Sequence, residues 1–348
     1  MEIRSAKKAE LVEIVDLQCL VFRPDEPAAS TRYWAYFHEE PTYQFEQSRI
    51  LIEQGRIVAH LRIWDRLIRV RGATLRVGGI GSVLTHPDFR GRGYAQALMR
   101  DAELYMQQAG YDLGMLFTII GTPFYAKLGW IPLPLPTFSF PVGEPTTAFS
   151  DSARILDDTA DLPAVMALYD AANVNQTGTE IRNSGYWRSG PSRYRELFPQ
   201  KGIERNGELV GYLNYDNNGS DLKVCEVCFM PGDDEACQVV AHTLFAAAKK
   251  EGLKTIKGSL PPDHTLLARL ADLGNSQPSF SQHQKTMVKM LDWATIRKKL
   301  TDMPPADPPS DEAAFWNELL NPRSASTPDW LDKLPDAQGF FYWDPDIF

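Results

Sequence analysis

The order of apolar and polar positions along the chain predicts a mixed α/β fold. Apolar residues recur three or four positions apart over Ala9–Val21, as in an amphipathic helix, and alternate with polar ones along 48–64, as in strands. The predicted elements are a strand at 2–4, a helix at 9–21, an irregular stretch at 23–43, strands within 48–64 and within 66–77, a strand at 80–85, a helix at 94–110 and a strand at 113–118. This succession is typical of helices packed on a mixed sheet.

The same pattern recurs in the second half of the chain. Gly55-x-x-Val58-x-x-Leu61 matches Gly207-x-x-Val210-x-x-Leu213, 152 residues later, and the offset then drifts along the chain. Prolines cluster between 131 and 150, which indicates a linker or a crossover strand. We therefore predict two tandem copies of one fold. The predicted divisions are a first domain at 1–145, a second domain at 153–298, and a linker with an aromatic, docking tail at 299–348.

Length and charge narrow the classes of partner. The chain has 348 residues, enough for two domains, and a net charge of −9. It has no basic tract long enough to follow a nucleic-acid backbone and no run near the roughly 20 apolar residues of a membrane span. We expect a cytoplasmic protein with neither nucleic acid nor membrane as partner. The acidic surface serves solubility or favours cationic substrates such as amines.

The four cysteines predict no metal site. Cys225 and Cys228 form a C-x-x-C pair, but they lie in an alternating stretch where positions three apart face opposite sides of a strand. No second pair and no nearby pair of histidines completes a zinc site. We expect Cys19, Cys225, Cys228 and Cys237 to be free thiols.

Residues 79–100 carry the most specific chemistry. A strand ends at His86-Pro87-Asp88, a glycine-rich turn follows, and a helix begins near Tyr94. Within the turn, Arg90-x-x-Gly93-x-Ala95 leaves the amide groups of a helix N-terminus uncovered, where an anion is stabilised by the helix dipole. Arg90 and Arg92 add donors. The turn predicts a phosphate cradle, with a solvated basic turn as the alternative.

These residues resemble the acetyl-coenzyme A signature R/Q-x-x-G-x-G/A of the GNAT superfamily of N-acetyltransferases. Pro123–Trp130 is similar to that superfamily's F-Y-x-x-x-G-F segment, in the same order along the chain. The resemblance implies a GNAT fold that takes acetyl-coenzyme A as cosubstrate and needs no metal. The residues implied to contact the coenzyme are Val83, Leu84, Thr85, Arg90, Gly91, Arg92, Gly93, Tyr94, Ala95, Gln96, Ile120 and Gly121.

Tyr125 is the candidate general acid. A phenol, with a pKa of about 10, keeps its proton at neutral pH and can donate it to a departing thiolate. Its place in Phe124-Tyr125-x-x-x-Gly129 matches the superfamily's tyrosine acid, and the alternative is a tyrosine packed in the core. No carboxylate lies between Gly78 and Thr85, so a water chain or an already neutral amine would replace a general base there.

The second copy lacks this chemistry. The segment Met230-Pro231-Gly232-Asp233-Asp234-Glu235-Ala236 stands where the cradle stood, and its carboxylates would repel a pyrophosphate. Leu270 stands opposite Tyr125. We therefore expect one coenzyme site per chain.

A tandem pair with one active copy resembles the enhanced-intracellular-survival (Eis) acetyltransferases, which acetylate amines of aminoglycosides and other polyamine-like or lysine-containing acceptors. In that group the terminal carboxylate on a phenylalanine serves as base, which implies the same role for Phe348. Those relatives carry a third domain, and the roughly 50 residues after Leu300 are too few for one.

The acceptor side has weaker signals. Tyr33, Trp34 and Phe37 lie in an aromatic segment that could wall an acceptor pocket or belong to the core. We expect N-acetylation of a primary amine. A non-catalytic acyl-coenzyme A sensor or scaffold, or a transferase using another thioester or a hydroxyl acceptor, remain alternatives. Duplicated folds and a docked tail leave faces that could pair in a homo-oligomer.

Overall fold

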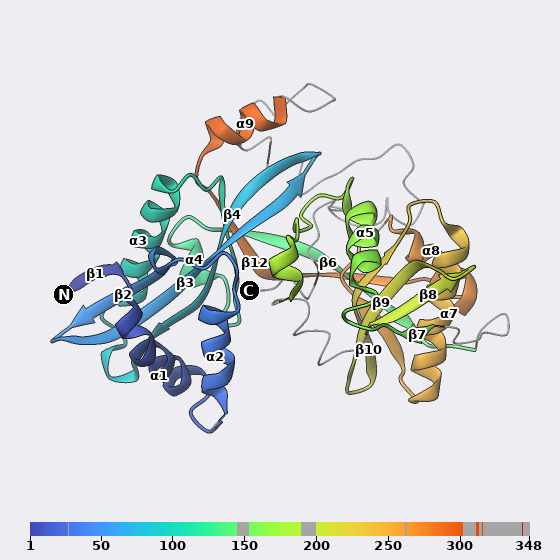
Figure 1. Ribbon diagram of the computed structural model, residues 1–348, viewed down its shortest axis with the longest axis horizontal. Coiled ribbons are helices and arrows are strands. Elements are labelled where there is room, and N and C mark those ends of the chain that lie inside the picture. The colour runs from blue at the N-terminus through green and yellow to red at the C-terminus, as the bar shows by residue number, and fades with distance from the viewer. Residues whose placement is uncertain are drawn as a thin grey trace.

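The fold is a single sheet that runs through two lobes (Figure 1). The computed structural model describes residues 1–26, 28–144, 153–188, 200–261, 263–301, 311–312, 315 and 343. Twelve strands in these residues have the order β1-β2-β3-β4-β5-β12-β6-β11-β10-β9-β8-β7. The mixed α/β class and the tandem arrangement predicted from the sequence are confirmed.

The first lobe follows the predicted succession closely. Two hairpins turn at Gln54-Gly55 and Arg71-Gly72, all four with positive φ, as two-residue hairpin turns of the primed type require. Its elements are β1 (Glu2–Ser5), η1 (Lys8–Glu10), α1 (Leu11–Phe22), α2 (Ala29–His38), η2 (Phe45–Gln47), β2 (Ser48–Glu53), β3 (Arg56–Val70), β4 (Ala73–Thr85), η3 (Pro87–Phe89), α3 (Tyr94–Gln108), β5 (Leu113–Phe117) and α4 (Pro123–Ala126).

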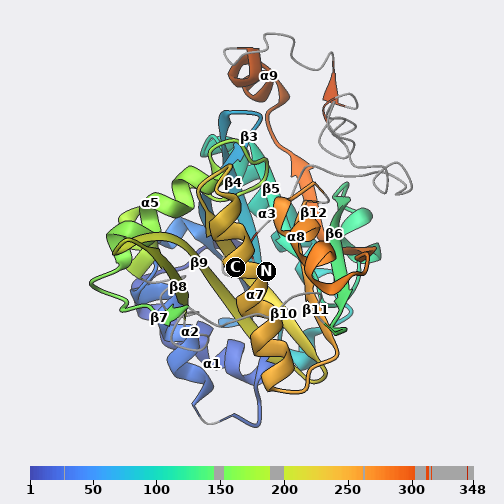
Figure 2. The same cartoon turned by 90° about the vertical axis from the view of Figure 1, so that its right-hand side faces the viewer.

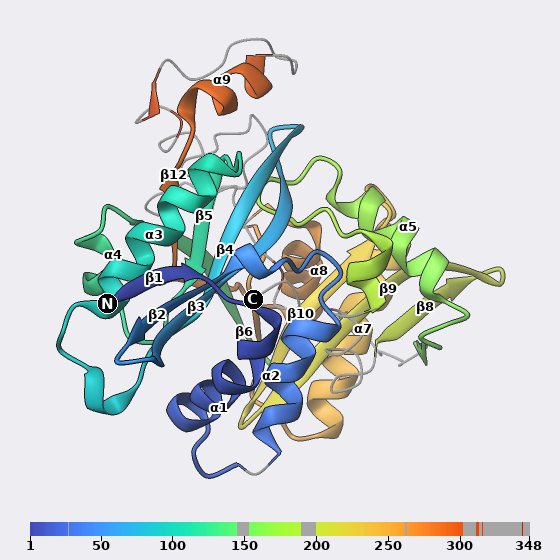
Figure 3. The same ribbon diagram turned by 60° about the vertical axis from the view of Figure 1, so that its left-hand side comes forward.

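Helices cover both faces of this lobe's sheet (Figure 3). Neighbouring residues of β2 show the division, because Ile50 packs with α1 and α2 whereas Leu51 packs with α3. Side chains that follow one another along a strand point to opposite faces. The sheet therefore separates a face under α1 and α2 from a face under α3 and α4.

The last strand of each half lies between the two lobes. β12 (Ser279–Met290) pairs with β5 of the first lobe, from Thr286–Phe117 to Met290–Leu113. β6 (Ile131–Pro141) pairs with β11 (Thr255–Gly258) of the second lobe, and β6 and β12 also pair with each other. Thus β12 of the second half lies beside the strands of the first lobe, and β6 of the first half lies beside the strands of the second lobe. The crossover strand predicted within 131–150 is present over 131–141, while the predicted boundaries at 145 and 153 stay predictions.

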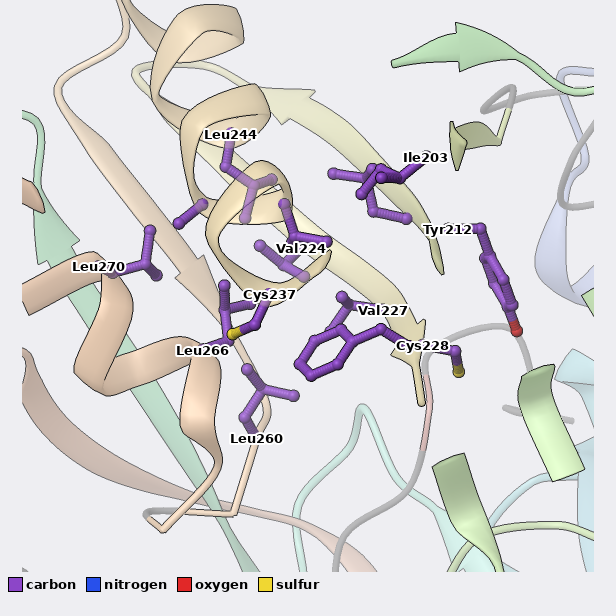
Figure 4. Close-up of a cluster of buried hydrophobic side chains, with 14 of the residues drawn as sticks. Ile203, Tyr212, Val224, Val227, Cys228, Cys237, Leu244, Leu260, Leu266 and Leu270 are labelled. Carbon is purple, nitrogen blue, oxygen red and sulfur yellow. The ribbon is translucent and has the colours of Figure 1, made fainter. Parts of the chain in front are cut away.

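The second lobe repeats the first in outline, and α7 packs on β9 and β10 (Figure 2). Its buried core, part of which is drawn in Figure 4, joins these strands to α5, α7 and α8. The remaining elements of the chain are β7 (Arg154–Ile155), α5 (Leu162–Asn173), β8 (Lys201–Arg205), β9 (Glu208–Asn218), β10 (Asp221–Phe229), α7 (Asp234–Lys250), α8 (Thr265–Gly274) and α9 (Trp293–Thr301).

Buried ion pairs line the junction of the lobes. Arg66 on β3 pairs with Glu40 at 2.9 Å and with Glu180, from the second half, at 3.2 Å. Arg182 donates to Glu226 of β10 at 3.2 Å, and both side chains are buried. Isolated charges would be costly at these positions, so the pairs fix the local geometry.

Two other sequence expectations can be compared with the structure. All four cysteines are free, as predicted, and Cys225, Cys228 and Cys237 are buried. Within the described ranges, no helix has the length and apolar character needed to cross a membrane.

Candidate active site

The site is built where β4 and β5 separate. Their parallel pairing runs only from Val77–Leu113 to Ile80–Leu116, although β4 continues to Thr85. Five residues of β4 therefore extend beyond the last pair with β5. Strands that diverge in this way leave backbone groups on the facing edge for another extended chain.

A bulge in β4 marks the start of this extension. Leu84 lies opposite His60 and Gly81 opposite Arg62, so β4 has one more residue than β3 at this point. Ser82, within the bulge, has a φ of +52°. Such bulges re-aim a strand next to functional sites.

The amides beyond the bulge alternate in direction. The His86 amide donates to the Val58 carbonyl of β3 at 2.8 Å. Since successive amides of a strand point to opposite neighbours, that of Thr85 points away from β3, toward the side from which β5 has diverged. The Leu84 side chain is buried with α1 and α2, and Val83 packs on the α3 side.

The predicted cradle begins at the end of β4. Gly91 and Gly93 both adopt left-handed backbone conformations, with φ of +77° and +78°, and a Cβ at either would meet no atom of the described part of the chain within 4 Å. Gly93 is the N-cap of α3 and provides no side-chain cap, so the first amides of this 15-residue helix are uncovered. Arg90 Nε donates to the Thr85 carbonyl at 3.3 Å, which ties the turn to the strand.

Glu53 is a neighbour of the cradle that sequence reasoning missed. It accepts a hydrogen bond from the Tyr94 hydroxyl, and Arg92 Nη1 lies 3.6 Å from its carboxylate. That hydrogen bond raises the pKa of Tyr94. Glu53 precedes the Gln54-Gly55 turn and comes close to α3 only through the fold, so no local sequence signal could have found it.

The corresponding helix start in the second lobe is closed by carboxylates. Asp233 is the N-cap of α7, and its side chain accepts from the Ala236 amide at 3.0 Å. Arg205 pairs with Asp233 at 2.7 Å and with Glu235 at 3.2 Å. The cap carboxylate occupies amide donors that are uncovered in α3, and an anion would meet negative charge here.

Tyr125 lies in α4, on the α3 side of the diverging strands. It is 6% exposed, and burial raises the pKa of its hydroxyl. It belongs to the same buried cluster as Ile80, Tyr94 and Leu116, with Val83 packed against that cluster. The fold therefore brings the candidate acid, the end of the β4–β5 pairing and the start of α3 together.

The loop between β5 and α4 holds the other two residues implied to contact the coenzyme. Ile120 is 70% exposed, and Gly121 has a φ of +90°. Thr118 Oγ1 donates to the Gly121 carbonyl at 3.2 Å and so closes the loop. The side chain of Ile120 thus presents apolar surface near the point where β4 and β5 diverge.

The aromatic residues suggested for the acceptor lie on the opposite face, in α2. Tyr33 and Phe37 are buried with Leu84 of β4, whereas Trp34 is half-buried and stacks on His38 at 5.2 Å. Most of this aromatic surface is therefore packed within the lobe. Phe348, the candidate base, lies outside the described residues.

Arg62 is an unexpected feature of this face. Its guanidinium lies 4.0 Å from the Tyr43 ring centroid, 4.4 Å from Trp64 and 5.3 Å from Phe37. Its three nitrogens are buried and have no hydrogen-bond partner among the residues that the structure describes, and burial lowers the pKa of Arg62 to about 10. Aromatic faces offset part of the cost of this buried cation. An arginine in an alternating strand is usually read as solvent-facing, so the sequence gives no hint of it.

The described residues contain no cluster of three or more His, Cys, Asp or Glu side chains that could hold a metal ion. The chemistry available from these residues is anion binding at the start of α3, hydrogen bonding by the edge of β4, and proton donation by Tyr125.

Comparisons with known proteins identify the first lobe. Residues 2–133 match the family described as "Acetyltransferase (GNAT) domain". An aminoglycoside 2'-N-acetyltransferase from Mycolicibacterium fortuitum is 29% identical over 125 residues, which cover 36% of this chain and 64% of that protein. The match thus spans just under two thirds of the relative's length.

Solved structures extend the likeness to both lobes. A probable N-acyltransferase from Enterococcus faecalis V583 has a TM-score of 0.69 at 14% identity, covering 86% of this chain and 74% of its own. A GCN5-related N-acetyltransferase from Anabaena variabilis gives 0.67 at 16%, covering 87% and 75%. Eis1 from Mycobacterium abscessus gives 0.59 at 16%, covering 84% and 74%. Residues 2–133 therefore match the GNAT acetyltransferase domain family, within a chain that has the tandem GNAT fold.

Proposed function

We propose that the chain transfers an acetyl group from acetyl-coenzyme A to a primary amine. The observation that carries this proposal is the combination of diverging strands, an uncovered helix N-terminus and a buried tyrosine in one lobe, within a GNAT domain. In this proposal the amides of Val83 and Thr85 bind the pantetheine arm as a neighbouring strand would. Amides from Gly91 to Gln96, with Arg90 and Arg92, bind the pyrophosphate.

The reaction proceeds by direct attack of the neutral amine on the thioester carbonyl. The tetrahedral intermediate collapses with cleavage of the C–S bond, and Tyr125 donates its proton to the departing thiolate. Because burial raises the pKa of Tyr125, the group keeps that proton at neutral pH. The amine loses its own proton to a base, for which the carboxylate of Phe348 or a water chain are the candidates.

The acceptor is proposed to be a small molecule, by analogy with the aminoglycoside acetyltransferase that matches the first lobe. It would approach from the α2 side of β4, because the coenzyme cradle lies at the start of α3. Trp34, the half-buried member of the aromatic set, is the proposed contact from this helix, together with the rims of Tyr33 and Phe37.

A panel of amines tests this proposal. Purified protein is mixed with acetyl-coenzyme A and aminoglycosides, polyamines or lysine peptides, and release of free thiol is followed. We expect release with at least one primary amine. Tight coenzyme binding without release by any amine would instead favour an acyl-coenzyme A sensor.

The stoichiometry of coenzyme binding tests the role of the second lobe. We propose one site per chain, because Asp233 caps α7 where α3 is uncapped. Calorimetric titration with coenzyme A should give one equivalent bound. Two equivalents would contradict the loss of the second site.

A further inference from the structure

The second lobe contains a cavity at the position that corresponds to the coenzyme cleft of the first. The β10–β11 pairing ends at Val224–Gly258 while β10 continues to Phe229, as β4 continues beyond Ile80. β10 also has an extra residue, Cys225, where β4 has its bulge. The duplicated fold therefore keeps the divergence of the strands after losing the glycine cradle.

The cavity encloses about 220 Å³ between these strand ends and the loops next to them. Val227 and Phe229 line it from β10, Gly232 from the turn before α7, and His264 from the start of α8. Among the lining residues that the structure describes there is no lysine or arginine. A pyrophosphate would find no cation here, and the carboxylates at the start of α7 would repel it.

Trp343, from the C-terminal segment, is one of the residues that line this cavity. Its side chain is 3% exposed and belongs to the same buried core as Val227 and Phe229. The indole Nε1 donates to Asn173 Oδ1 at 2.9 Å. An indole has a large apolar body and one donor; the buried core that includes Val227 and Phe229 packs around the ring, and Asn173 supplies the acceptor.

Asn173 is held in the orientation that this contact needs. It is the last residue of α5 and is 1% exposed. Its Nδ2 donates to the Tyr169 carbonyl at 2.7 Å, so the Oδ1 atom is turned toward the indole. Because the Nδ2 atom of Asn173 is held by the Tyr169 carbonyl, the Oδ1 atom is already oriented to accept the hydrogen bond from the indole.

We infer that the second lobe has converted part of its former coenzyme cleft into a binding site for an indole ring, and that this ring is the chain's own Trp343. The ring forms one wall of the cavity that remains, and its hydrogen bond to Asn173 anchors it to the second lobe.

Chemical rescue tests the anchor without reference to acetyl transfer. Trp343→Ala removes the ring and should lower the Tm of the full chain by about 5 °C or more, as loss of a buried aromatic side chain does. Free indole at millimolar concentration should bind this variant and recover part of the loss. The wild-type protein, in which Trp343 occupies the ring site and only the cavity beside it is open, should show a smaller shift with indole.

Three further variants exclude trivial explanations. Trp293→Ala removes a tryptophan that packs on a different core cluster, and indole should leave its Tm unchanged. Trp343→Phe keeps an aromatic ring without the N–H and should have an intermediate Tm, which keeps the test valid if the alanine variant folds poorly. Adding Asn173→Ala to Trp343→Ala should weaken indole binding at least fivefold, since one hydrogen bond is lost.

Two results would overturn the inference. Equal indole-induced shifts in the wild type and the alanine variant would show that the ring does not occupy this site, and an unchanged Tm in the alanine variant would show that it is no anchor.

Discussion

Replacing Gly93 with aspartate would copy onto α3 the acidic start of α7. Gly93 has a φ of +78° and open space around it, so a side chain fits but the backbone is strained. A left-handed residue other than glycine costs about 1–2 kcal/mol, and an N-cap carboxylate returns about 0.5–2 kcal/mol. We therefore expect the free energy of unfolding of Gly93→Asp to stay within about 1 kcal/mol of the wild type.

Coenzyme binding should respond much more strongly. A carboxylate at Gly93 would lie about 5 Å from a pyrophosphate held by the same amides, and two unit charges at that distance repel by about 0.8 kcal/mol in water. With the two charges of a pyrophosphate the repulsion is about 1.7 kcal/mol, which raises the Kd roughly 15-fold even when the dielectric constant is that of water. Because the carboxylate would also occupy amide donors, 15-fold is the smallest effect that we expect.

Isothermal titration with coenzyme A measures this effect, with a matched control in the second lobe. Gly219 also has a positive φ, +69°, and nothing within 4 Å of an added Cβ. Gly219→Asp adds the same charge with the same kind of backbone strain, and its Kd should equal that of the wild type. If Gly93→Asp also binds coenzyme A with wild-type affinity, the start of α3 is not the phosphate site.

Three other predictions concern the chemistry and the junction of the lobes. Tyr125→Phe should lower kcat by about 10²-fold or more with little change in coenzyme affinity, and unchanged turnover would exclude Tyr125 as the general acid. Because burial raises the pKa of Tyr125, wild-type activity that is limited by this group should decline only above about pH 10. Adding residues after Phe348 should reduce kcat if its carboxylate is the base, and wild-type activity in that variant would exclude it. Glu226→Ala leaves Arg182 buried without this carboxylate and should lower the free energy of unfolding in urea by about 3–5 kcal/mol. The double variant Glu226→Leu, Arg182→Met should lose less stability, because it leaves no buried charge. Equal losses in the two variants would show that the unpaired buried charge is not the cause.

Local elements of the fold could be predicted because their signals are local. The strands predicted within 48–64 are β2 and much of β3, and the helix predicted at 9–21 is present as α1, Leu11–Phe22. The strand ending before His86 and the helix beginning at Tyr94 also agree with the structure. Turn residues and helical spacing act within a few positions, so the sequence displays them directly. The helix Ala29–His38 was only partly expected, within a stretch interpreted as irregular.

Features that depend on distant pairing could not be predicted in this way. Nothing in the sequence of 279–290 indicates that this strand pairs with β5 rather than within its own half. Glu53 and Arg62 likewise have local patterns typical of a hairpin end and a solvent-facing strand position. Their actual partners, Tyr94 and an aromatic cage, come from elements that meet only in the folded lobe.

The mass of the acceptor after reaction shows whether the protein acetylates an amine. The protein is incubated with isotopically labelled acetyl-coenzyme A and each amine of the panel, and the amine is then examined by mass spectrometry, with Gly93→Asp at the same concentration as control. We expect a labelled acetyl group on at least one primary amine, in an amount that falls with the weakened coenzyme binding of the variant. Coenzyme binding by the wild type with no labelled amine, or equal labelling by the wild type and Gly93→Asp at subsaturating coenzyme, would refute amine acetylation at this site.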